Sequence, residues 1–432
     1  MSTGQLLQQC LRLFPRVKVD VAIESWLFAV GLLEHHYAQL HRSKRCWSWR
    51  YIDELLADRN AFFFNNMPPH GAETAPVTTK DDLRLRLEQW INRAVISEPL
   101  WVKMTSGTTG PPTSVVQTAD FQFDNLFLRP LRALEAIGLS AEPECVILAL
   151  TDNPDCEDVM WPNPWGGAVI QICINELVQA DIEKLWGIID IVRPKLITTK
   201  PSLLSALAAL DGFGFSGLPG AAVLVSGANF TSAQRLHYRA LLGVPIVEAY
   251  GLTEVGLMAV SCSCGCGLKV DQDVLVEVLD SDGVPVAPGE IGQLVITSLR
   301  NRALPLIRYA TGDLARLGLN NAQCDSGDAV HILELAGREL RPFRSVEGRP
   351  ISAARFHALF TAFPILEFQL TQKSIDCWQL DVEVADGAVI DAQAMRLWVE
   401  QRVGTPLNIL VRFCIVDTKK GKFQRYQCLV TQ

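Results

Sequence analysis

A loop rich in glycine and hydroxyl side chains follows an apolar segment in the first third of the chain. The loop runs from Thr105 to Ser114, and the preceding residues Leu100–Met104 predict a buried strand. Glycine lets the backbone approach an anion closely, and amides and hydroxyls donate hydrogen bonds to its oxygens. The segment therefore indicates a phosphate-binding loop, although an ordinary Ser/Thr/Gly turn has the same composition. The common P-loop pattern is excluded, because it ends in Gly-Lys-Ser/Thr and here Gly110 precedes two prolines.

Two later segments contain carboxylate side chains next to glycines and hydroxyl side chains. The first, Glu248–Gly256, has the sequence EAYGLTEVG, and the second, Arg308–Leu314, has the sequence RYATGDL; a Gly-Arg-Glu triplet follows at residues 337–339. Carboxylate oxygens accept hydrogen bonds from hydroxyls and are hard ligands of the kind Mg²⁺ binds. Taken singly, the same residues fit a solvated glutamate, a core tyrosine and a turn-forming aspartate.

In this order the segments resemble the motifs of the adenylate-forming enzymes, which include acyl-CoA synthetases, NRPS adenylation domains and luciferases. The Gly-Pro-Pro-Thr sequence of the loop, the chain length and a cysteine cluster after the Tyr-Gly-Leu-Thr-Glu motif favour the phenylacetate-CoA ligase branch. The resemblance extends from about residue 101 to the C-terminus. It implies that ATP activates an aromatic or heteroaromatic carboxylic acid to an acyl-adenylate with release of pyrophosphate. The acyl group then passes to a thiol, that of coenzyme A or of phosphopantetheine on a carrier protein.

The resemblance also implies roles for matching residues. Glu254, next to Thr253, matches the residue that holds Mg²⁺, Tyr250 the one that packs on adenine, and Asp313 the one that binds the ribose hydroxyls. Lys422 matches the lysine that enters the site during adenylation, although a solvated basic tail is the alternative. The other residues expected to contact ATP are Thr105, Ser106, Gly107, Thr108, Thr109, Gly110, Gly227, Ala228, Asn229, Glu248, Ala249, Gly251 and Arg338.

A cysteine cluster is the candidate metal centre. Three thiols lie within residues 262–266 and another follows at Cys324. Some phenylacetate-CoA ligase relatives bind a structural zinc here, but their histidine position is Lys269 in this chain and one of their later cysteines is Ser326. Four thiolates would complete a tetrahedral zinc site: Cys262, Cys264, Cys266 and Cys324. Free or redox-active thiols are the alternative.

Several departures from the family pattern bear on the reaction. The loop has Pro111 or Pro112 where the family has a lysine, the hinge reads Gly-Arg-Glu-Leu-Arg, and the lid pattern is replaced at residues 344–348. The motifs therefore support adenylation more strongly than thioester formation. An amine acceptor and a non-catalytic binding protein on the same fold stay open. Residues 161–167 and 228–230 are the expected walls of the acid pocket.

Composition limits the partners. The 432 residues carry a formal net charge of −8 with 49% hydrophobic residues, which argues against nucleic-acid binding and allows a sizeable core. The sequence has no apolar run of membrane-spanning length and no apparent secretory signal, so we expect a cytoplasmic protein. A homodimer stays open as the assembly.

Alternating apolar runs and helical patterns between residues 145 and 250 predict an α/β fold with a mostly parallel, helix-covered sheet. Expected strands cover residues 145–151, 168–174, 196–199, 221–225 and 245–249, and expected helices cover residues 177–192, 202–210 and 232–242. Strands at 273–279 and 293–298 indicate a small β subdomain. An order of helix 351–360, strands 366–371 and 378–384, helix 392–403 and strand 409–416 predicts an α+β lid. The predicted domains are 1–337, which binds ATP and the acid, and 338–432, a mobile lid.

Overall fold

The computed structural model describes most of the chain after residue 71. The described residues are 18–19, 72–105, 113–142, 144–152, 156–174, 179–210, 213–227, 232–262, 265–318, 329–338, 343–384, 388–416 and 424–430. Within these ranges no helix is both long enough and apolar enough to cross a membrane.

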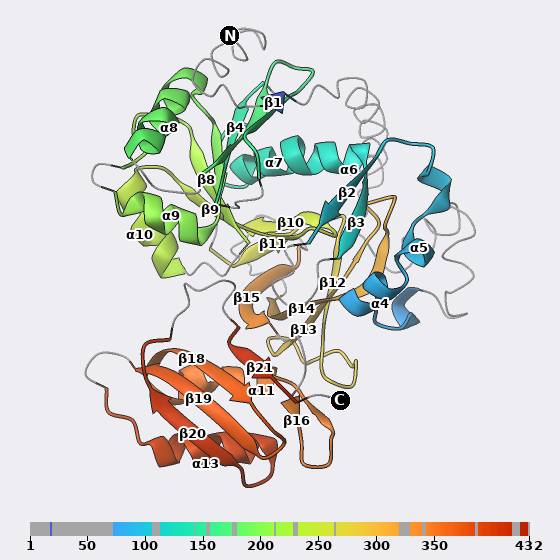
Figure 1. Ribbon diagram of the computed structural model, residues 1–432, viewed down its shortest axis with the longest axis vertical. Coiled ribbons are helices and arrows are strands. Elements are labelled where there is room, and N and C mark those ends of the chain that lie inside the picture. The colour runs from blue at the N-terminus through green and yellow to red at the C-terminus, as the bar shows by residue number, and fades with distance from the viewer. Residues whose placement is uncertain are drawn as a thin grey trace.

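Five parallel strands form the centre of the main sheet, in the order β6-β4-β7-β8-β9. Helices cover both faces (Figure 1). The strands are β4 (Val146–Thr151), β6 (Ala168–Cys173), β7 (Leu196–Thr199), β8 (Ala222–Ser226) and β9 (Ile246–Leu252). The helices on one face are α8 (Gln179–Val192), α9 (Pro201–Ala208) and α10 (Ser232–Leu242), and those on the other are α6 (Ala119–Phe123), the π-helical η3 (Asp124–Leu128) and α7 (Arg129–Glu135). The predicted α/β class and all five strands are confirmed.

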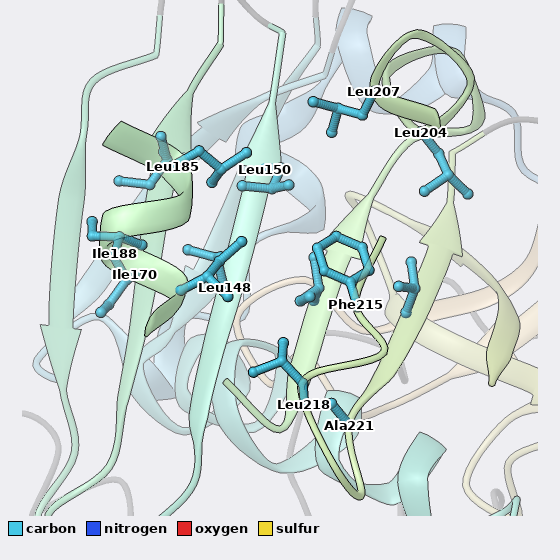
Figure 2. Packing of buried hydrophobic residues seen from close by; sticks show 14 of the residues in the cluster. Leu148, Leu150, Ile170, Leu185, Ile188, Leu204, Leu207, Phe215, Leu218 and Ala221 are labelled. Atoms are coloured by element: carbon cyan, nitrogen blue, oxygen red, sulfur yellow. The ribbon is translucent and has the colours of Figure 1, made fainter. Parts of the chain in front are cut away.

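Successive side chains along each strand point to opposite faces of the sheet, so a separate hydrophobic core forms on each face. On the face of α8 and α9, strand residues such as Leu148 and Ile170 pack under helix residues such as Leu185 and Leu204 (Figure 2). Val247 and Ala249 point to the opposite face and pack with Phe123 and other residues of α6–α7. Burial on both faces is typical of the parallel strands of α/β folds.

The main sheet continues beyond β9 through antiparallel strands, and in the described part of the chain it has thirteen strands. The added strands on this side are, in order, β10 (Gly256–Ser261), β11 (Leu268–Val270), β15 (His331–Arg338), β14 (Leu306–Gly318), β13 (Ile291–Ser298) and β12 (Leu275–Leu279). The hairpin β12–β13 matches the two strands expected at 273–279 and 293–298. The expected small β subdomain is thus continuous with the main sheet, because β10 and β11 pair on both sides.

A two-stranded ribbon carries the candidate phosphate loop between β2 (Leu100–Met104) and β3 (Ser114–Thr118). The predicted strand at 100–104 is confirmed, but its burial is wrong: Val102 is 65% exposed and Met104 57% exposed. The reason is that, within the described residues, β2 pairs only with β3, so β3 covers the core and β2 lies on its outer side.

The C-terminal unit is a four-stranded sheet with order β20-β19-β18-β21. Its strands are β18 (Ile365–Gln372), β19 (Cys377–Val384), β20 (Asn408–Phe413) and β21 (Tyr426–Cys428). Helix α13 (Ala392–Val403) is capped at its N-terminus by Asp391, whose side chain accepts a hydrogen bond from Gln393 N, and at its C-terminus by Gly404, with φ of 85°. The helix expected at 351–360 is instead two short helices, α11 (Ala354–His357) and α12 (Leu359–Ala362).

The core of the C-terminal unit also includes Leu314 of β14 and Ala336 of β15, so this unit packs on the main sheet (Figure 1). The division at residue 337 stays a prediction. The remaining elements are β1 (Lys18–Val19), η1 (Ala72–Thr74), α4 (Lys80–Leu85), α5 (Leu87–Trp90), η2 (Arg93–Val95), β5 (Val159–Pro162), β16 (Phe343–Arg344) and β17 (Pro350–Ile351).

Candidate functional site

A tight turn between β9 and β10 carries Thr253 and Glu254. Gly256 follows the turn with φ of +75°, and a Cβ there would lie 1.8 Å from Asn125 Oδ1, so only glycine fits. The same Asn125 oxygen accepts a 3.1 Å hydrogen bond from Leu257 N. Arg300 Nη1 donates to Leu257 O at 2.7 Å. The side chains of Asn125 on η3 and of Arg300, two residues after β13, therefore both hold the backbone of the turn at Leu257.

Glu254 is buried, with 4% of its surface exposed, yet its carboxylate has polar neighbours. The Tyr309 hydroxyl donates a 3.1 Å hydrogen bond to Glu254 Oε1, and Lys80 Nζ lies 3.6 Å from the same oxygen. Burial, and then the charge of Glu254, raise the pKa of Tyr309 well above its ordinary value, so the hydroxyl remains a donor at neutral pH.

Lys80 reaches this carboxylate because its helix is tied to β14. Thr78 exchanges backbone hydrogen bonds with β14, from Thr78 N to Arg308 O at 2.9 Å and from Ala310 N to Thr78 O at 2.8 Å. Thr79 then starts α4 with a capping box to Asp82, which places Lys80 in the first turn of the helix. A cation is thereby held next to the Glu254 carboxylate.

Asp313 lies inside β14 rather than in a free turn. The pairing of β14 with β13 shifts around residues 311–313, and Gly312 has φ of 78°, as expected of a bulge. The Tyr250 hydroxyl donates to Asp313 Oδ2 at 2.6 Å, and Arg338 Nε donates to Oδ1 at 2.9 Å. Burial, and then the charge of Asp313, raise the pKa of Tyr250 well above its ordinary value.

The base of the phosphate loop is closed by Thr105 and Thr113. Thr105 N donates to Thr113 O, and Thr113 N donates to the Thr105 hydroxyl oxygen, both at 3.0 Å. Thr105 thus lies at the neck of the loop. The rest of the predicted phosphate-binding set falls outside the described residues: Ser106, Gly107, Thr108, Thr109 and Gly110.

Other predicted ATP-binding residues lie on β8 and β9. Gly227 follows β8, Gly251 pairs with Leu257 of β10, and the Ala249 side chain packs in the α6–α7 core. Burial raises the pKa of Glu248 to about 7 against the opposing charge of Arg235. Ala228 and Asn229 are outside the described residues.

Lys422 also falls outside the described residues, but Arg425 of the same motif is placed. Arg425 forms a bidentate pair with Glu367 at 2.7 and 2.6 Å and donates from Nη1 to Ala336 O at 2.9 Å. The start of β21 is therefore fixed beside the end of β15, where Arg338 contacts Asp313.

Two of the four cysteines predicted to bind zinc lie in the described residues. Cys262 and Cys266 flank a turn between β10 and β11, in which Cys262 N donates to Gly267 O at 2.9 Å. Cys264 and Cys324 lie outside the described residues. Within the described part of the chain, no three His, Cys, Asp or Glu side chains are grouped as a metal site. Zinc binding therefore stays a prediction.

The structure brings together three of the predicted segments, through Tyr250, Glu254, Asp313 and Arg338. Sequence reasoning missed Tyr309 and Lys80. Tyr309 precedes Asp313 by four residues in the same strand, and its position next to the Thr-Gly-Asp motif is the signal that could have identified it. Lys80 lies more than 170 residues before Glu254, and no local pattern signals their contact.

Comparisons with known proteins identify the family. The family model described as AMP-binding enzyme matches residues 73–300. A phenylacetate-coenzyme A ligase of Escherichia coli (strain K12) is 29% identical over 255 residues, or 56% of this chain and 56% of the relative, so the match spans little more than half of that enzyme. A phenylacetate-coenzyme A ligase of Thermus thermophilus is 29% identical over 356 residues, covering 78% of this chain and 76% of the relative.

An open conformation of 2-hydroxyisobutyryl-CoA ligase, solved in complex with 2-HIB-AMP and CoA, has the same fold. Its TM-score is 0.59 at 16% identity, and the match covers 87% of this chain and 89% of that one. The fold, the convergence of the motifs and a family model that matches more than half of the residues lead to one conclusion: the chain belongs to the AMP-binding enzyme family.

Proposed function

We propose that this protein activates a carboxylic acid with ATP, giving an acyl-adenylate and pyrophosphate, and then transfers the acyl group to the thiol of coenzyme A. The observation that carries the proposal is the buried group in which Tyr250 and Arg338 both bind Asp313, while Tyr309 and Lys80 approach Glu254. The named relatives that match the chain are phenylacetate-coenzyme A ligases, which supports an aromatic acid as substrate.

Each half of this group suits one part of ATP. The Asp313 carboxylate has acceptor capacity left beyond its two donors, which suits the ribose hydroxyls. The Tyr250 hydroxyl is held at that carboxylate, and the motif assigns its ring to adenine. Glu254 fits Mg²⁺ because it offers a hard carboxylate oxygen, and the metal, when bound, neutralises charge on the phosphates.

Lys80 compensates for the lysine that the phosphate loop lacks. The loop has Pro111 and Pro112 where the family has a cation. Lys80 Nζ, 3.6 Å from Glu254 and with its side chain 33% exposed, can reach a phosphate oxygen next to that carboxylate. A lysine ammonium is a compact charge on a flexible stem, so it suits this role from a helix outside the loop.

The acid pocket is proposed beside residues 161–167. Asn163 is 7% exposed, and its Oδ1 accepts hydrogen bonds from Trp165 N at 3.0 Å and Gly167 N at 2.9 Å, which orders the segment. The Trp165 ring lies 5.7 Å from the Phe123 ring. Phe123 is buried in the core, whereas Trp165 is 37% exposed, so the Trp165 ring can stack on an aromatic acid.

Acid-dependent exchange of labelled pyrophosphate into ATP tests the first half-reaction. We expect exchange with arylacetic or heteroaromatic acids, and a fall of several orders of magnitude in Lys422→Ala, in which the charge at the α-phosphate is lost. Lys420→Ala, in the same basic segment, is the matched control and should retain exchange. No exchange across a broad acid panel would favour a non-catalytic binding protein.

The acceptor is tested separately. Mass spectrometry of products formed with coenzyme A, a phosphopantetheinylated carrier protein or a panel of amines should show the acyl-CoA thioester. An amide product would instead establish the amine-acceptor alternative. Elemental analysis of the purified protein tests zinc, for which about one equivalent is expected from a four-thiolate site.

A further inference from the structure

A buried glutamine connects the phosphate loop to the turn that carries Glu254. Gln117 lies on β3, the strand that leaves the loop, and is 4% exposed. Its Nε2 donates a 2.8 Å hydrogen bond to Thr253 O, 136 residues away in the sequence. Because Thr253 O is only an acceptor, the amide orientation follows from this contact. The contact is between elements that share no strand pairing.

The other end of this amide has no partner within the part of the chain that the structure describes. Gln117 Oε1 is buried and receives no hydrogen bond there. A buried acceptor without a donor costs about 1–3 kcal/mol. An apolar side chain of the same size would avoid that cost, but it would leave Thr253 O without this donor.

We propose that Gln117 is a positioning residue for Mg·ATP: it fixes the Thr253–Glu254 turn relative to the strand that leaves the phosphate loop. The bond acts on the peptide carbonyl directly before Glu254, so it sets where the carboxylate lies against the β- and γ-phosphates. Asn125 and Arg300 hold the other side of the turn at Leu257, and Gln117 is the contact on the side of the loop.

The side-chain amide of Asn301, which follows β13 and bonds to the backbone of β3, supplies a matched control. Asn301 Nδ2 donates a 2.8 Å hydrogen bond to Val116 O, and Asn301 Oδ1 is also buried without a partner in the described residues. This amide has the same bond type as Gln117 and similar burial, but its acceptor is the carbonyl of the residue before Gln117. Within the described part of the chain, Asn301 forms no hydrogen bond with the Thr253–Glu254 turn. Loss of the Asn301 hydrogen bond therefore measures the effect on folding stability and binding that any lost amide bond to β3 would have.

The test is isothermal titration of Mg·ATP and of AMP into wild type, Gln117→Met and Asn301→Leu, with the unfolding temperature of each. Methionine keeps the length of glutamine without its hydrogen bond. We expect Gln117→Met to raise the Kd of Mg·ATP about tenfold, which corresponds to the loss of the one hydrogen bond to Thr253 O. The Kd of AMP should stay within about twofold of wild type. Asn301→Leu should leave both affinities unchanged.

Two further measurements separate this role from a folding defect. Gln117→Asn, one methylene too short to reach Thr253, should show the same selective loss if the methionine variant does not fold. In the double variant with Glu254→Gln, the two effects on Mg·ATP affinity should be clearly less than additive, because Gln117 acts through that turn. Additive effects would overturn the inference.

The inference rests on the proposed function, and the two fail differently. Wild type that binds neither Mg·ATP nor AMP would overturn both. Wild type that binds Mg·ATP, together with a Gln117→Met variant of equal affinity, would overturn the inference alone. Equal losses for Mg·ATP and AMP in that variant would also overturn it, because a positioning role at the phosphates does not predict weaker AMP binding.

Discussion

The Tyr250 hydroxyl lies 2.6 Å from Asp313 Oδ2, although 63 residues separate the two in the sequence. The bond joins β9 of the parallel half of the sheet to β14 of the antiparallel half. Strands β9 and β14 belong to one continuous sheet, in which β10, β11 and β15 lie between them. The Tyr250–Asp313 bond therefore spans three intervening strands.

Tyr250→Phe should weaken AMP binding about tenfold. The variant keeps the ring but removes the hydroxyl that orients Asp313, and a hydrogen bond to a charged group contributes about 1.5–3 kcal/mol. Titration calorimetry with AMP measures the effect. Tyr426→Phe, which removes a hydroxyl 3.1 Å from His357 Nδ1 in the C-terminal unit, is the control and should bind AMP normally. Equal affinity in both variants would contradict the role of Tyr250.

Lys80→Met should raise the KM for Mg·ATP several-fold while changing the stability little, because the ammonium is partly exposed. The measurement is pyrophosphate exchange against ATP concentration. Arg84→Met, on the same helix, removes a cation that pairs with the exposed Asp81. A parallel rise of KM in both variants would show that general surface charge, rather than Lys80, attracts the nucleotide.

Glu248→Gln should stabilise the protein at pH 8 and progressively less as the pH falls. Burial raises the pKa of Glu248 to about 7 from its ordinary value of 4.5, so the folded state binds more protons than the unfolded state between these values. Wild-type stability therefore decreases as the pH rises through this window, whereas glutamine carries no charge. Urea unfolding at pH 5 and pH 8 measures the difference, and Glu290→Gln at an exposed position controls for net charge. A pH-independent difference would contradict the assignment.

Arg129→Met should destabilise the protein by about 3–5 kcal/mol, because it leaves buried carboxylates without their partner. Arg129 Nε donates to Asp124 at 2.6 Å, and its other nitrogens bind Asp271 and Asp273. Burial alone would raise the pKa of Asp273, but Arg129 and Arg300 lower it far below its ordinary value.

Urea unfolding at neutral pH measures this loss. The control is Arg349→Met, whose ion pair with Glu347 at 3.7 Å is largely exposed and should contribute less than about 1 kcal/mol. If the two variants lose similar stability, the buried network is not a major stabilising feature.

Periodicity predicted the parallel half of the fold well. The strands at 168–174 and 221–225 appear within a residue of their expected limits, because each is a largely apolar run buried on both faces. The antiparallel half was predicted less well. β14 is 13 residues long and contains the Thr-Gly-Asp motif as a bulge, and a bulge interrupts the period of two that identifies a strand.

The candidate site was predicted where the chemistry is local and missed where it depends on tertiary structure. Tyr250, Glu254 and Asp313 stand in short motifs, so residue types and spacing identify them. Lys80 and Gln117 reach the same turn from α4 and β3, and their contacts depend on how those elements pack. The zinc ligands, Lys422 and most of the phosphate loop stay predictions.

The contact between Asn125 and Gly256 also constrains how this sequence can diverge. A side chain at 256 would overlap the Asn125 amide and would need a backbone conformation that L-residues rarely adopt. Because that strain is present whatever residue occupies position 125, changing Asn125 cannot make room for a side chain at 256. Homologues that keep this turn should therefore retain Gly256, whereas a change at Asn125 costs the hydrogen bond to Leu257 N and leaves the glycine in place.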